Sequence, residues 1–560
     1  MNARRLGAMA GAIAMIVGLF AGCGSSNDAS GTSTSDGSGD GKSSTYSTDG
    51  AKESIRIASG SENKEVDDAI KQAATAANVS VTVDYMGSLD IMDALRNKGH
   101  HAGQDYDAVW PASSMWISMG DTHHIVKDQV STSTTPVVLG VKKSKAKELG
   151  WVKSDGSTKS VGTKNIMAAV RAKKLSFAMT SATQSNSGAS AYMAFLTALN
   201  GGDGALTKAD LNDAALQSSV KTMLSGVNHS SGSSDWLKDM LVNDPDASDS
   251  MVNYESLVIQ ANKELTAKNT EPLLAIYPSD GISVSDSPLA YVDRGQNKEQ
   301  AFKRFRKAIT SKDSKKLFER AGRRTGLGGT LTYAKDSQVK DSFRKEWGID
   351  TDASVLKTIT MPSAEVIEQA LDAYQTGLRK PAYTLWVVDY SGSMSGQGKS
   401  GVVSGLQAAL DTDQARASHI EPGDGDVNVF IPFNGDASVA QTAHGKRTAE
   451  LLAAGENQPA IGSTDIYNAL EVALRNLPSD RDDYTVAIAL LTDGQSETGK
   501  LEEFKQRYES EGKGVPIFSI MFGDADSNQL NDLATLSNGK VFDGRNGDLS
   551  GIFREVKGYN

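Results

Sequence analysis

One stretch, residues 384–395, constrains the fold of this chain more than any other; it reads TLWVVDYSGSMS. Its first half is an apolar run that ends at Asp389, as expected for a strand that is buried on both faces of a parallel sheet. Ser391 and Ser393 follow at alternate positions, so the three side chains can face one point. A carboxylate and two hydroxyls at the end of a buried strand predict an oxygen-rich site for a hard cation.

Two later stretches carry groups that can complete this site. Thr464 lies in a Gly-Ser turn, IGSTDIYNAL, at the start of an amphipathic helix. Asp493 ends a second apolar strand, YTVAIALLTDG. Oxygen ligands of this kind fit Mg²⁺ or Mn²⁺ well, whereas few such sites suit zinc or copper. The alternative interpretation is a polar loop that binds no metal.

The pattern resembles the metal-ion-dependent adhesion site of the von Willebrand factor A (VWA) domains: D-x-S-x-S, a distant Thr, and a distant Asp in a T-D-G context. The resemblance rests on Asp389, Ser391, Ser393, Thr464 and Asp493. It covers about residues 380–560 and implies a doubly wound, Rossmann-like sheet with the metal at the carboxyl ends of the strands. It also implies that the Ser and Thr hydroxyls contact the metal, that the Asp residues act directly or through water, and that a partner carboxylate takes the open position.

The beginning of the chain has the pattern of an export signal. Two arginines precede an apolar run over residues 6–20. Cys23, the only cysteine in the sequence, follows Ala-Gly and cannot form an internal disulfide. Its place resembles a bacterial lipobox, which implies that residues 1–22 are a lipoprotein signal peptide and that lipid at Cys23 anchors the protein to the membrane outside the cytoplasm. An ordinary signal peptide that is cut near Ala21 is the alternative.

Residues 24–50 contain mainly Gly, Ser, Thr and Asp and have almost no apolar side chains. A segment of this composition cannot bury enough surface to offset the entropy cost of ordering. We therefore predict a disordered tether that, together with the lipidated Cys, spans residues 23–52.

From residue 53 onward, short apolar strands alternate with helices, which predicts a mostly parallel sheet with polar loops at the strand ends. The order resembles the two-lobed, periplasmic-binding-protein-like solute-binding proteins of ABC importers, over about residues 53–345. The resemblance rests on this layout and on loops such as SGSENK, DYDAVWPASS and TQSNSGASAY. It implies a cleft that holds a small solute.

Hydroxyl and amide side chains in these loops are candidate contacts to such a solute. They are Ser61, Ser88, Ser113, Ser114, Ser185, Asn186 and Ser187. Exposed amides at a helix N-terminus can bind an anion or a carboxylate. For each of these side chains, capping of a turn or helix is the alternative role.

Residues 346–379 link the two halves and contain one further helix. The tandem of a solute-binding-like domain and a VWA domain behind a lipobox looks like a class of bacterial surface lipoproteins. The formal net charge of −11 and the lack of a basic stripe argue against nucleic acid as a partner.

Three function classes follow from the sequence. The favoured one is a surface protein for adhesion or scaffolding that binds an acidic residue of a partner protein through Mg²⁺ or Mn²⁺. The alternative is the solute receptor of an ABC-type importer with an accessory VWA domain. An enzyme is the third class; we do not expect it, because an all-hydroxyl site has no evident general base.

Overall fold

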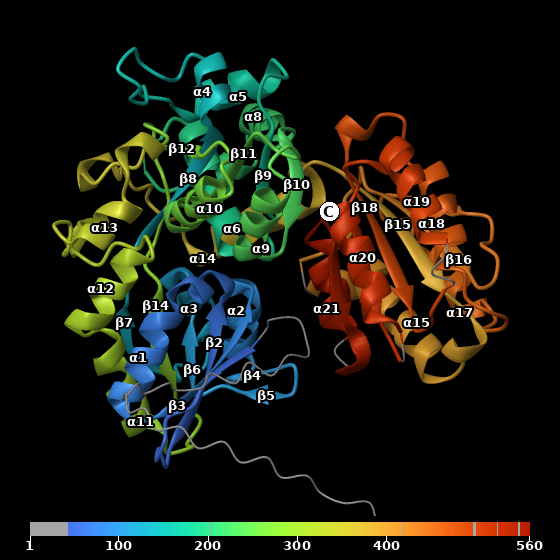
Figure 1. Cartoon of the computed structure of the whole chain (residues 1–560), viewed down its shortest axis with the longest axis horizontal. Helices are drawn as coiled ribbons and strands as arrows, with labels where there is room; N and C mark the ends of the chain where they lie inside the picture. Colours follow the sequence, from blue (N-terminus) through green and yellow to red (C-terminus); the bar gives the residue numbers. More distant parts are fainter. Residues whose placement is uncertain are drawn as a thin grey trace, which may run out of the picture. The chain divides into compact units, whose positions relative to one another are not determined.

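The computed structural model describes residues 43–559, apart from Asp203, Ser418, residues 497–499, Asp524 and residues 547–548. Three six-stranded sheets with helices packed on them make up this part of the chain, which confirms the predicted α/β class. Figure 1 shows that the first two sheets come from the N-terminal half of the chain and the third from its C-terminal part. Every helix in the described ranges is too short or too polar to span a bilayer.

The first sheet and its helices form lobe 1, with the strand order β1-β3-β2-β6-β14-β7. The strands are β1 (Ser43–Tyr46), β2 (Ser54–Gly60), β3 (Ser80–Met86), β6 (Ala108–Trp110), β7 (Val126–Ser131) and β14 (Pro288–Val292). Helices α1 (Asp67–Ala77) and α11 (Glu299–Ile309) bury apolar side chains on one face. Helices α2 (Ser88–Arg96) and α3 (Ser114–Gly120) cover the other. The central strand β6 is therefore buried throughout, whereas the edge strand β7 alternates between half-buried and exposed residues.

The second sheet and its helices form lobe 2, with the order β10-β9-β11-β8-β12 and β13 paired to β8. The strands are β8 (Thr135–Lys142), β9 (Phe177–Thr180), β10 (Val227–Ser231), β11 (Ser250–Tyr254), β12 (Leu273–Ile276) and β13 (Val284–Ser285). Helix α6 (Asn186–Leu199) is buried along almost its whole length against one face of this sheet. Helix α10 (Glu255–Ala267) covers the opposite face.

Shorter elements complete the two lobes. They are β4 (His100–His101), β5 (Gln104–Asp105), α4 (Lys143–Glu148), α5 (Thr163–Arg171), α7 (Lys208–Leu211), α8 (Ala214–Leu224), α9 (Ser234–Asn243), α12 (Lys312–Arg320) and α13 (Ser337–Ser342).

Two strand connections join the lobes. The chain leaves lobe 1 between β7 and β8 and returns to it between β13 and β14. The backbone N–H of Thr132 donates to the carbonyl of Ser287 at 3.2 Å, so the two connections lie side by side. Next to them, Arg324 and Glu255 form a fully buried ion pair, with N···O distances of 2.8 and 2.7 Å. A hinge between the lobes therefore lies at these paired connections.

Two predictions for this half of the chain are wrong in part. The sheets are mixed and not mostly parallel, because β1, β7, β8, β12 and β14 each pair with a neighbour that runs the opposite way. The predicted disordered tether of residues 23–52 contains a strand, β1, which pairs with β3. The buried ring of Tyr46 holds this strand in place, since its hydroxyl donates to Asp67 at 2.6 Å. Residues 23–42 lie outside the described residues.

The linker helix α14 (Ala364–Ala373) belongs structurally to the N-terminal half. Its apolar side chains, among them Val366 and Leu371, join the core of lobe 2. The hydroxyl of Tyr192 on α6 donates to the carbonyl of Ala370 at 3.0 Å. A short π-helix over Tyr374–Leu378 follows and leads into the third sheet.

The third sheet has the order β17-β16-β15-β18-β19-β20, and all its pairs are parallel except that of β17. The strands are β15 (Ala382–Asp389), β16 (Val427–Phe433), β17 (Gln441–His444), β18 (Thr485–Thr492), β19 (Ile517–Met521) and β20 (Lys540–Asp543). After β15 the chain adds β16 and β17 on one side of it, and it then adds β18, β19 and β20 on the other side. The strand order therefore reverses between β15 and β18. This is the doubly wound arrangement, in which ligands bind outside the carboxyl ends of the strands at the point of reversal.

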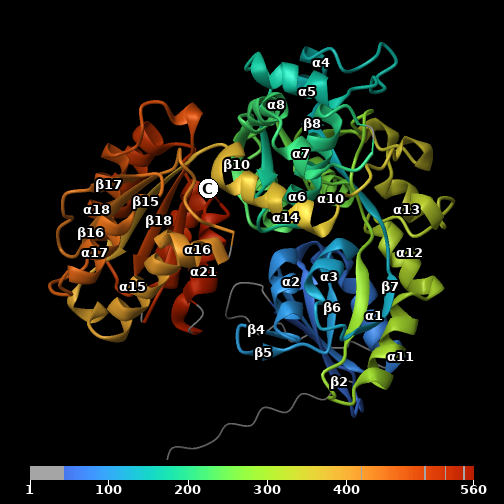
Figure 2. The ribbon, with the colours of Figure 1, turned by 180° about the vertical axis from the view of Figure 1, so that it is seen from behind.

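Helices cover both faces of this sheet, as Figure 2 shows for the side that carries α15 and α21. The helices are α15 (Gln397–Leu410), α16 (Thr412–Ala417), α17 (Ala449–Asn457), α18 (Ile466–Arg475), α19 (Leu501–Arg507), α20 (Ser527–Ser537) and α21 (Leu549–Lys557). Side chains of α18, α19 and α20 pack on one face, and those of α15, α17 and α21 pack on the other.

Candidate metal site and solute cleft

Asp389 is the buried centre of the candidate metal site, at the carboxyl end of β15. Its side chain is 0% exposed. The backbone N–H of Ser391 donates to Oδ1 at 2.7 Å, and the hydroxyl of Thr492 donates to Oδ2 at 2.6 Å. These two bonds fix the carboxylate at the edge where the strand order reverses.

A chain of short polar contacts joins three of the other predicted residues. The hydroxyl oxygens of Ser391 and Ser393 are 3.0 Å apart. The hydroxyl of Ser393 in turn donates to Oδ1 of Asp493 at 2.8 Å. The loop after β15 thus meets the loop after β18, and three oxygen-bearing side chains converge beside Asp389.

Thr464 reaches the same place from the turn before α18. A Cβ atom added at Gly494 would lie 2.6 Å from the Thr464 hydroxyl, so this hydroxyl sits directly against the residue that follows Asp493. The N–H of Gly392 donates to the carbonyl of Gly462 at 3.0 Å and ties this turn to the β15 loop. Gly462 has a positive φ of 89°, which a residue with a side chain adopts only at a cost. The structure thus brings all five predicted residues together.

Burial raises the pKa of Asp389, and the negative charge of Asp493 adds to this rise. The hydrogen bonds from Thr492 and Ser391 act in the opposite direction, because they stabilise the ionised form. A carboxylate that is buried without a positively charged partner is costly, and a bound cation would offset that cost.

The donors at this site fit Mg²⁺ or Mn²⁺. Two carboxylates and three hydroxyls supply only oxygen, which these ions prefer. Within the described ranges, no cluster of three or more His, Cys, Asp and Glu side chains is placed to hold a metal. The candidate site differs from such clusters because most of its donors are hydroxyls.

The candidate solute contacts divide into those at the junction of the lobes and those with a local role. Ser61 lies at the junction, where its hydroxyl accepts from Ser233 of lobe 2 at 3.1 Å. On the lobe 2 side, the hydroxyls of Ser185 and Ser187 lie 2.9 and 2.7 Å from that of Ser234. Ser185, Ser187 and Ser234 are buried at the N-termini of α6 and α9, where their hydroxyls bond to one another, whereas Ser61 and Ser233 line the polar cavity.

Asn186 also connects the lobes. Its Oδ1 accepts from the indole N–H of Trp116 in lobe 1 at 2.7 Å. Its amide nitrogen donates to Tyr254 and to Ser285 of lobe 2 at 2.9 Å each. The amide group is therefore held by both lobes.

The remaining candidates have local partners or positions. Ser113 caps α3, since its hydroxyl accepts from the N–H of Met115 at 3.3 Å. The N–H of Ser114 donates to Asp286 at 2.8 Å. Ser88 is buried in the first turn of α2. For Ser113, the predicted alternative of helix capping describes what the side chain does.

Sequence reasoning missed Ser233 and Ser234. They lie in the stretch SSGSSDW, in which Ser233 caps α9 by accepting from the N–H of Trp236. A run of serines that opens a helix is the same signal that identified Ser185–Ser187, so the sequence did carry it. The buried Glu62, whose pKa burial raises to about 7, was also missed, because a single Glu after a strand has no distinctive pattern.

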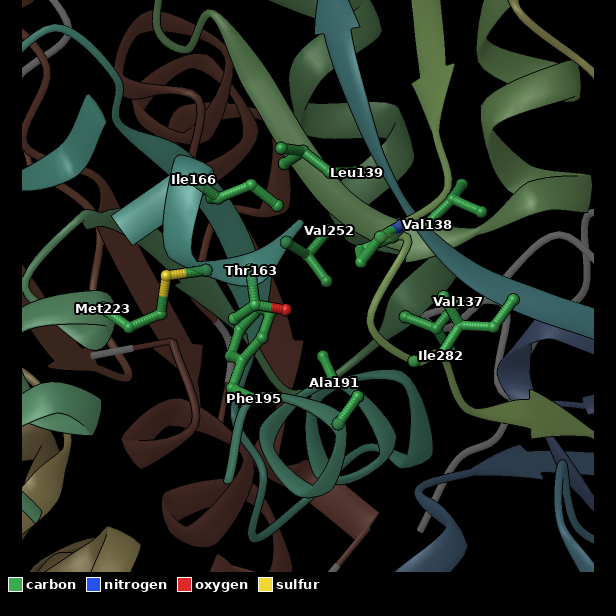
Figure 3. Close-up of a pocket in the computed structure, with 13 residues that line it drawn as sticks. Val137, Val138, Leu139, Thr163, Ile166, Ala191, Phe195, Met223, Val252 and Ile282 are labelled. Atoms are coloured by element: carbon green, nitrogen blue, oxygen red, sulfur yellow. The ribbon is translucent and has the colours of Figure 1, made fainter. Parts of the chain in front are cut away.

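Two cavities differ in character. A polar cavity of about 470 Å³ is lined mainly by lobe 1, with Gln184 and Ser233 of lobe 2 and with His419, Arg554 and Glu555 of the third-sheet domain. A second cavity of about 20 Å³ lies inside lobe 2, where the apolar side chains of Ile166, Phe195 and Met223 point toward one another (Figure 3). The second offers room for about one water molecule and few polar groups, so of these two cavities only the first has the volume and polar lining that a solute requires.

Two α/β lobes around a polar junction define a two-lobed binding domain, and the third sheet defines a doubly wound domain with an oxygen-rich strand end. Residues 55–324 match the family of bacterial extracellular solute-binding proteins. Residues 386–555 match the von Willebrand factor type A domain. The chain thus carries a solute-binding domain followed by a VWA domain.

Solved structures with similar folds include binding proteins of several kinds. The sulfate-binding protein SubI from Mycobacterium tuberculosis H37Rv is 17% identical, with 55% of this chain and 93% of that chain covered and a TM-score of 0.37. A Streptococcus pneumoniae solute-binding protein in complex with the blood group A-trisaccharide is 15% identical, with 55% and 89% covered and a TM-score of 0.39. A von Willebrand factor type A protein from Catenulispora acidiphila is 20% identical, with 33% and 43% covered and a TM-score of 0.27. No curated protein matches the chain.

Proposed function

We propose that the VWA domain binds a protein partner through a divalent cation, Mg²⁺ or Mn²⁺. The observation that carries this proposal is the set of short contacts that runs from the buried Asp389 through the backbone N–H of Ser391 and the hydroxyls of Ser391 and Ser393 to Asp493. Together with Thr464, these residues would hold the cation. A bound cation supplies positive charge that an acidic side chain of a partner can approach.

The rest of the chain supports a role outside the cytoplasm. The solute-binding family that residues 55–324 match is extracellular. We propose that lipid at Cys23, which lies outside the described residues, anchors the protein to the membrane. In this arrangement the protein is an adhesion or scaffolding protein of the cell surface that does not act as an enzyme and does not bind nucleic acid.

The proposal can be tested without knowing the partner. Mn²⁺ binding to the full chain is measured by electron paramagnetic resonance, with and without a short Glu-containing peptide as a carboxylate donor. Linkage requires that a carboxylate that binds at the metal also tightens the binding of the metal. We expect tighter Mn²⁺ binding with the peptide, and loss of Mn²⁺ binding in Asp389→Ala.

The matched control is Asp424→Ala, which removes an exposed carboxylate of the same domain. It should bind Mn²⁺ as the unchanged chain does. If Asp389→Ala and Asp424→Ala bind Mn²⁺ equally well, the metal site is not at Asp389 and the proposal fails.

A second candidate function is that of a solute receptor for an ABC-type importer, with the VWA domain as an accessory. The hydrogen bond between Ser61 of lobe 1 and Ser233 of lobe 2, which both line the polar cavity, favours it. Native mass spectrometry of the purified chain should then show a small molecule bound in the cleft. A chain that stays free of ligand through a broad screen of solutes would count against this function.

A further inference from the structure

The two lobes are closed on each other by direct contacts. Besides the Ser61–Ser233 and Trp116–Asn186 hydrogen bonds, Lys64 of lobe 1 lies 3.7 Å from Asp235 of lobe 2. Trp116 and other apolar side chains of lobe 1 share one hydrophobic cluster with lobe 2. Separation of the lobes would expose the side chains that are buried between them, so what holds the lobes together controls access to this interface.

Helix α2 of lobe 1 presents a row of three charged side chains, Asp90, Asp93 and Arg96. They are three residues apart, so they lie along one side of the helix. All three pair with residues that follow the solute-binding domain in the sequence. This row, which we call the α2 latch face, is therefore a docking surface for the C-terminal part of the chain.

The first contact of the latch face is with the linker helix α14. Nη2 of Arg96 lies 2.6 Å from Oε1 of Glu368. Helix α14 is itself packed into lobe 2 through Ile367 and Leu371 and through the Tyr192 hydroxyl. The ion pair thus fastens lobe 1 to a helix that belongs to lobe 2 (Figure 2).

The second contact is with α21, the last helix of the VWA domain. Nη2 of Arg554 lies 2.5 Å from Asp90, and Nη1 lies 3.8 Å from Asp93. The carbonyl of the same residue accepts from Nε2 of Gln184, in lobe 2, at 2.5 Å. One residue of the VWA domain therefore bridges the two lobes and also lines the polar cavity.

The VWA domain is held to lobe 2 by a different and broader set of contacts. The ring of Trp236 on α9 meets the ring of Tyr559 edge-on at 4.7 Å. The hydroxyl of Ser230 donates to the carbonyl of Gly558 at 2.9 Å, and the amide of Asn538 donates to the carbonyl of Met240 at 3.1 Å. Lobe 2, α14 and the VWA domain thus form one side of the hinge, to which the latch face ties lobe 1.

We propose that the α2 latch face locks the solute-binding cleft, so that lobe 1 swings open only when its ion pairs to Glu368 and Arg554 are released. The VWA domain then controls the opening of the cleft, in addition to its own binding function. This inference does not depend on metal binding or on the identity of the solute.

The ion pairs of the α2 latch face are weak enough for the lobes to separate. Its members are partly exposed, with side-chain exposure of 20% for Arg554, 26% for Asp90 and 45% for Glu368. Each ion pair of this exposure changes the equilibrium constant between closed and separated lobes by up to about fivefold. Two pairs together can hold the lobes closed and still release them, and salt should weaken both.

The experiment measures the distance between the lobes in the full chain. Spin labels are placed on cysteines at Lys71 of α1 and Ser218 of α8, both exposed, and Cys23 is changed to Ser so that no other cysteine reacts. Pulsed electron paramagnetic resonance then gives the distribution of inter-lobe distances. We expect one narrow distance in the parent chain and a second, longer distance in Arg554→Glu combined with Glu368→Gln.

Two further variants make the result specific. Arg475→Glu reverses a charge whose ion pair lies within α18 at 3.7 Å, so it should leave the narrow distance unchanged. Arg554→Glu with Asp90→Arg restores an opposite-charge pair and should reduce the population with the longer distance. A single narrow distance in the latch variant, with thermal unfolding like that of the parent chain, would overturn the proposal.

If the latch variant does not fold, Asp90→Asn with Asp93→Asn and Arg96→Gln is measured instead, because these changes remove the charges of the α2 latch face that pair with Arg554 and Glu368. This variant should also show the longer distance. An unchanged distance distribution in it likewise overturns the proposal.

Discussion

Changing Asp389 to Asn tests whether the buried carboxylate is built for a cation. Asn keeps the size of the side chain and one acceptor oxygen for the N–H of Ser391. The hydroxyl of Thr492, which donates to the carboxylate at 2.6 Å, can turn to accept from the new amide. The loss in hydrogen bonding is therefore no more than about 1 kcal/mol.

The pH dependence of stability should change in a defined direction. Because burial raises the pKa of Asp389, the native state without metal holds this proton more tightly than the unfolded chain does. The free energy of unfolding therefore falls as pH rises from the ordinary range of an Asp side chain through the raised native pKa. Asn does not titrate, so this part of the pH dependence should be absent from Asp389→Asn.

A bound cation would offset this fall in the free energy of unfolding, because it stabilises the ionised form of Asp389. At about 100 times its dissociation constant, a ligand stabilises the native state by about 2.7 kcal/mol. For a domain the size of residues 386–555, this corresponds to a rise in the unfolding temperature of about 5 to 11 °C. The rise should shrink as pH falls through the raised pKa of Asp389, because protons compete with the metal.

Calorimetry of the full chain with Mg²⁺, with Mn²⁺ and without metal checks these expectations. The unfolding transition of the VWA domain should shift in the unchanged chain and in Asp424→Asn, but not in Asp389→Asn. An equal shift in all three proteins would refute the reasoning, because the stabilising ion would then bind elsewhere.

Two further predictions concern buried charges. Glu255→Gln leaves the fully buried Arg324 without its carboxylate, so the free energy of unfolding should fall by about 3 to 5 kcal/mol in a denaturant titration. Adding Arg324→Met to the same chain should restore part of this loss. An unchanged free energy of unfolding in Glu255→Gln would mean that the pair is not buried as described. Burial lowers the pKa of Lys557 to about 8, so the unfolded chain binds this proton more tightly and stability should rise from about pH 8 toward the ordinary range of lysine. Lys557→Met should flatten this rise and stabilise the protein at neutral pH by up to about 3 kcal/mol in the same titration, while an unchanged pH profile would contradict the assignment.

The metal-site geometry could be predicted from the sequence because each part of it is local. Asp389 ends one apolar strand and Asp493 directly follows another, and strands that are buried on both faces are recognisable one at a time. Parallel neighbours in a doubly wound sheet then place their carboxyl ends at one edge. That a cation binds there stays a prediction.

The parts that could not be predicted depend on distant pairing. Nothing in the residues of β14 indicates that it runs antiparallel to both β6 and β7, since an apolar strand can pair in either direction. The strand β1 is four residues long and lies in a polar segment, so only its contact with β3 reveals it. Arg554 reads as one basic residue on an amphipathic helix, and its role depends on α2, far away in the sequence.

The strand β1 has a mechanical consequence. It lies at the edge of its sheet, where it pairs with β3 alone among the strands and bonds to α1 through Tyr46 and Asp67. If Cys23 is fixed to a membrane and the VWA domain to a partner, any pull between them reaches β1 before the other strands of lobe 1, because β1 is the first strand of the described residues. Peeling off its four residues would lengthen the tether by about 14 Å, while the remaining strands of lobe 1 stay paired. The detachment of β1 would thus take up a pulling force before that force acts on the two binding domains.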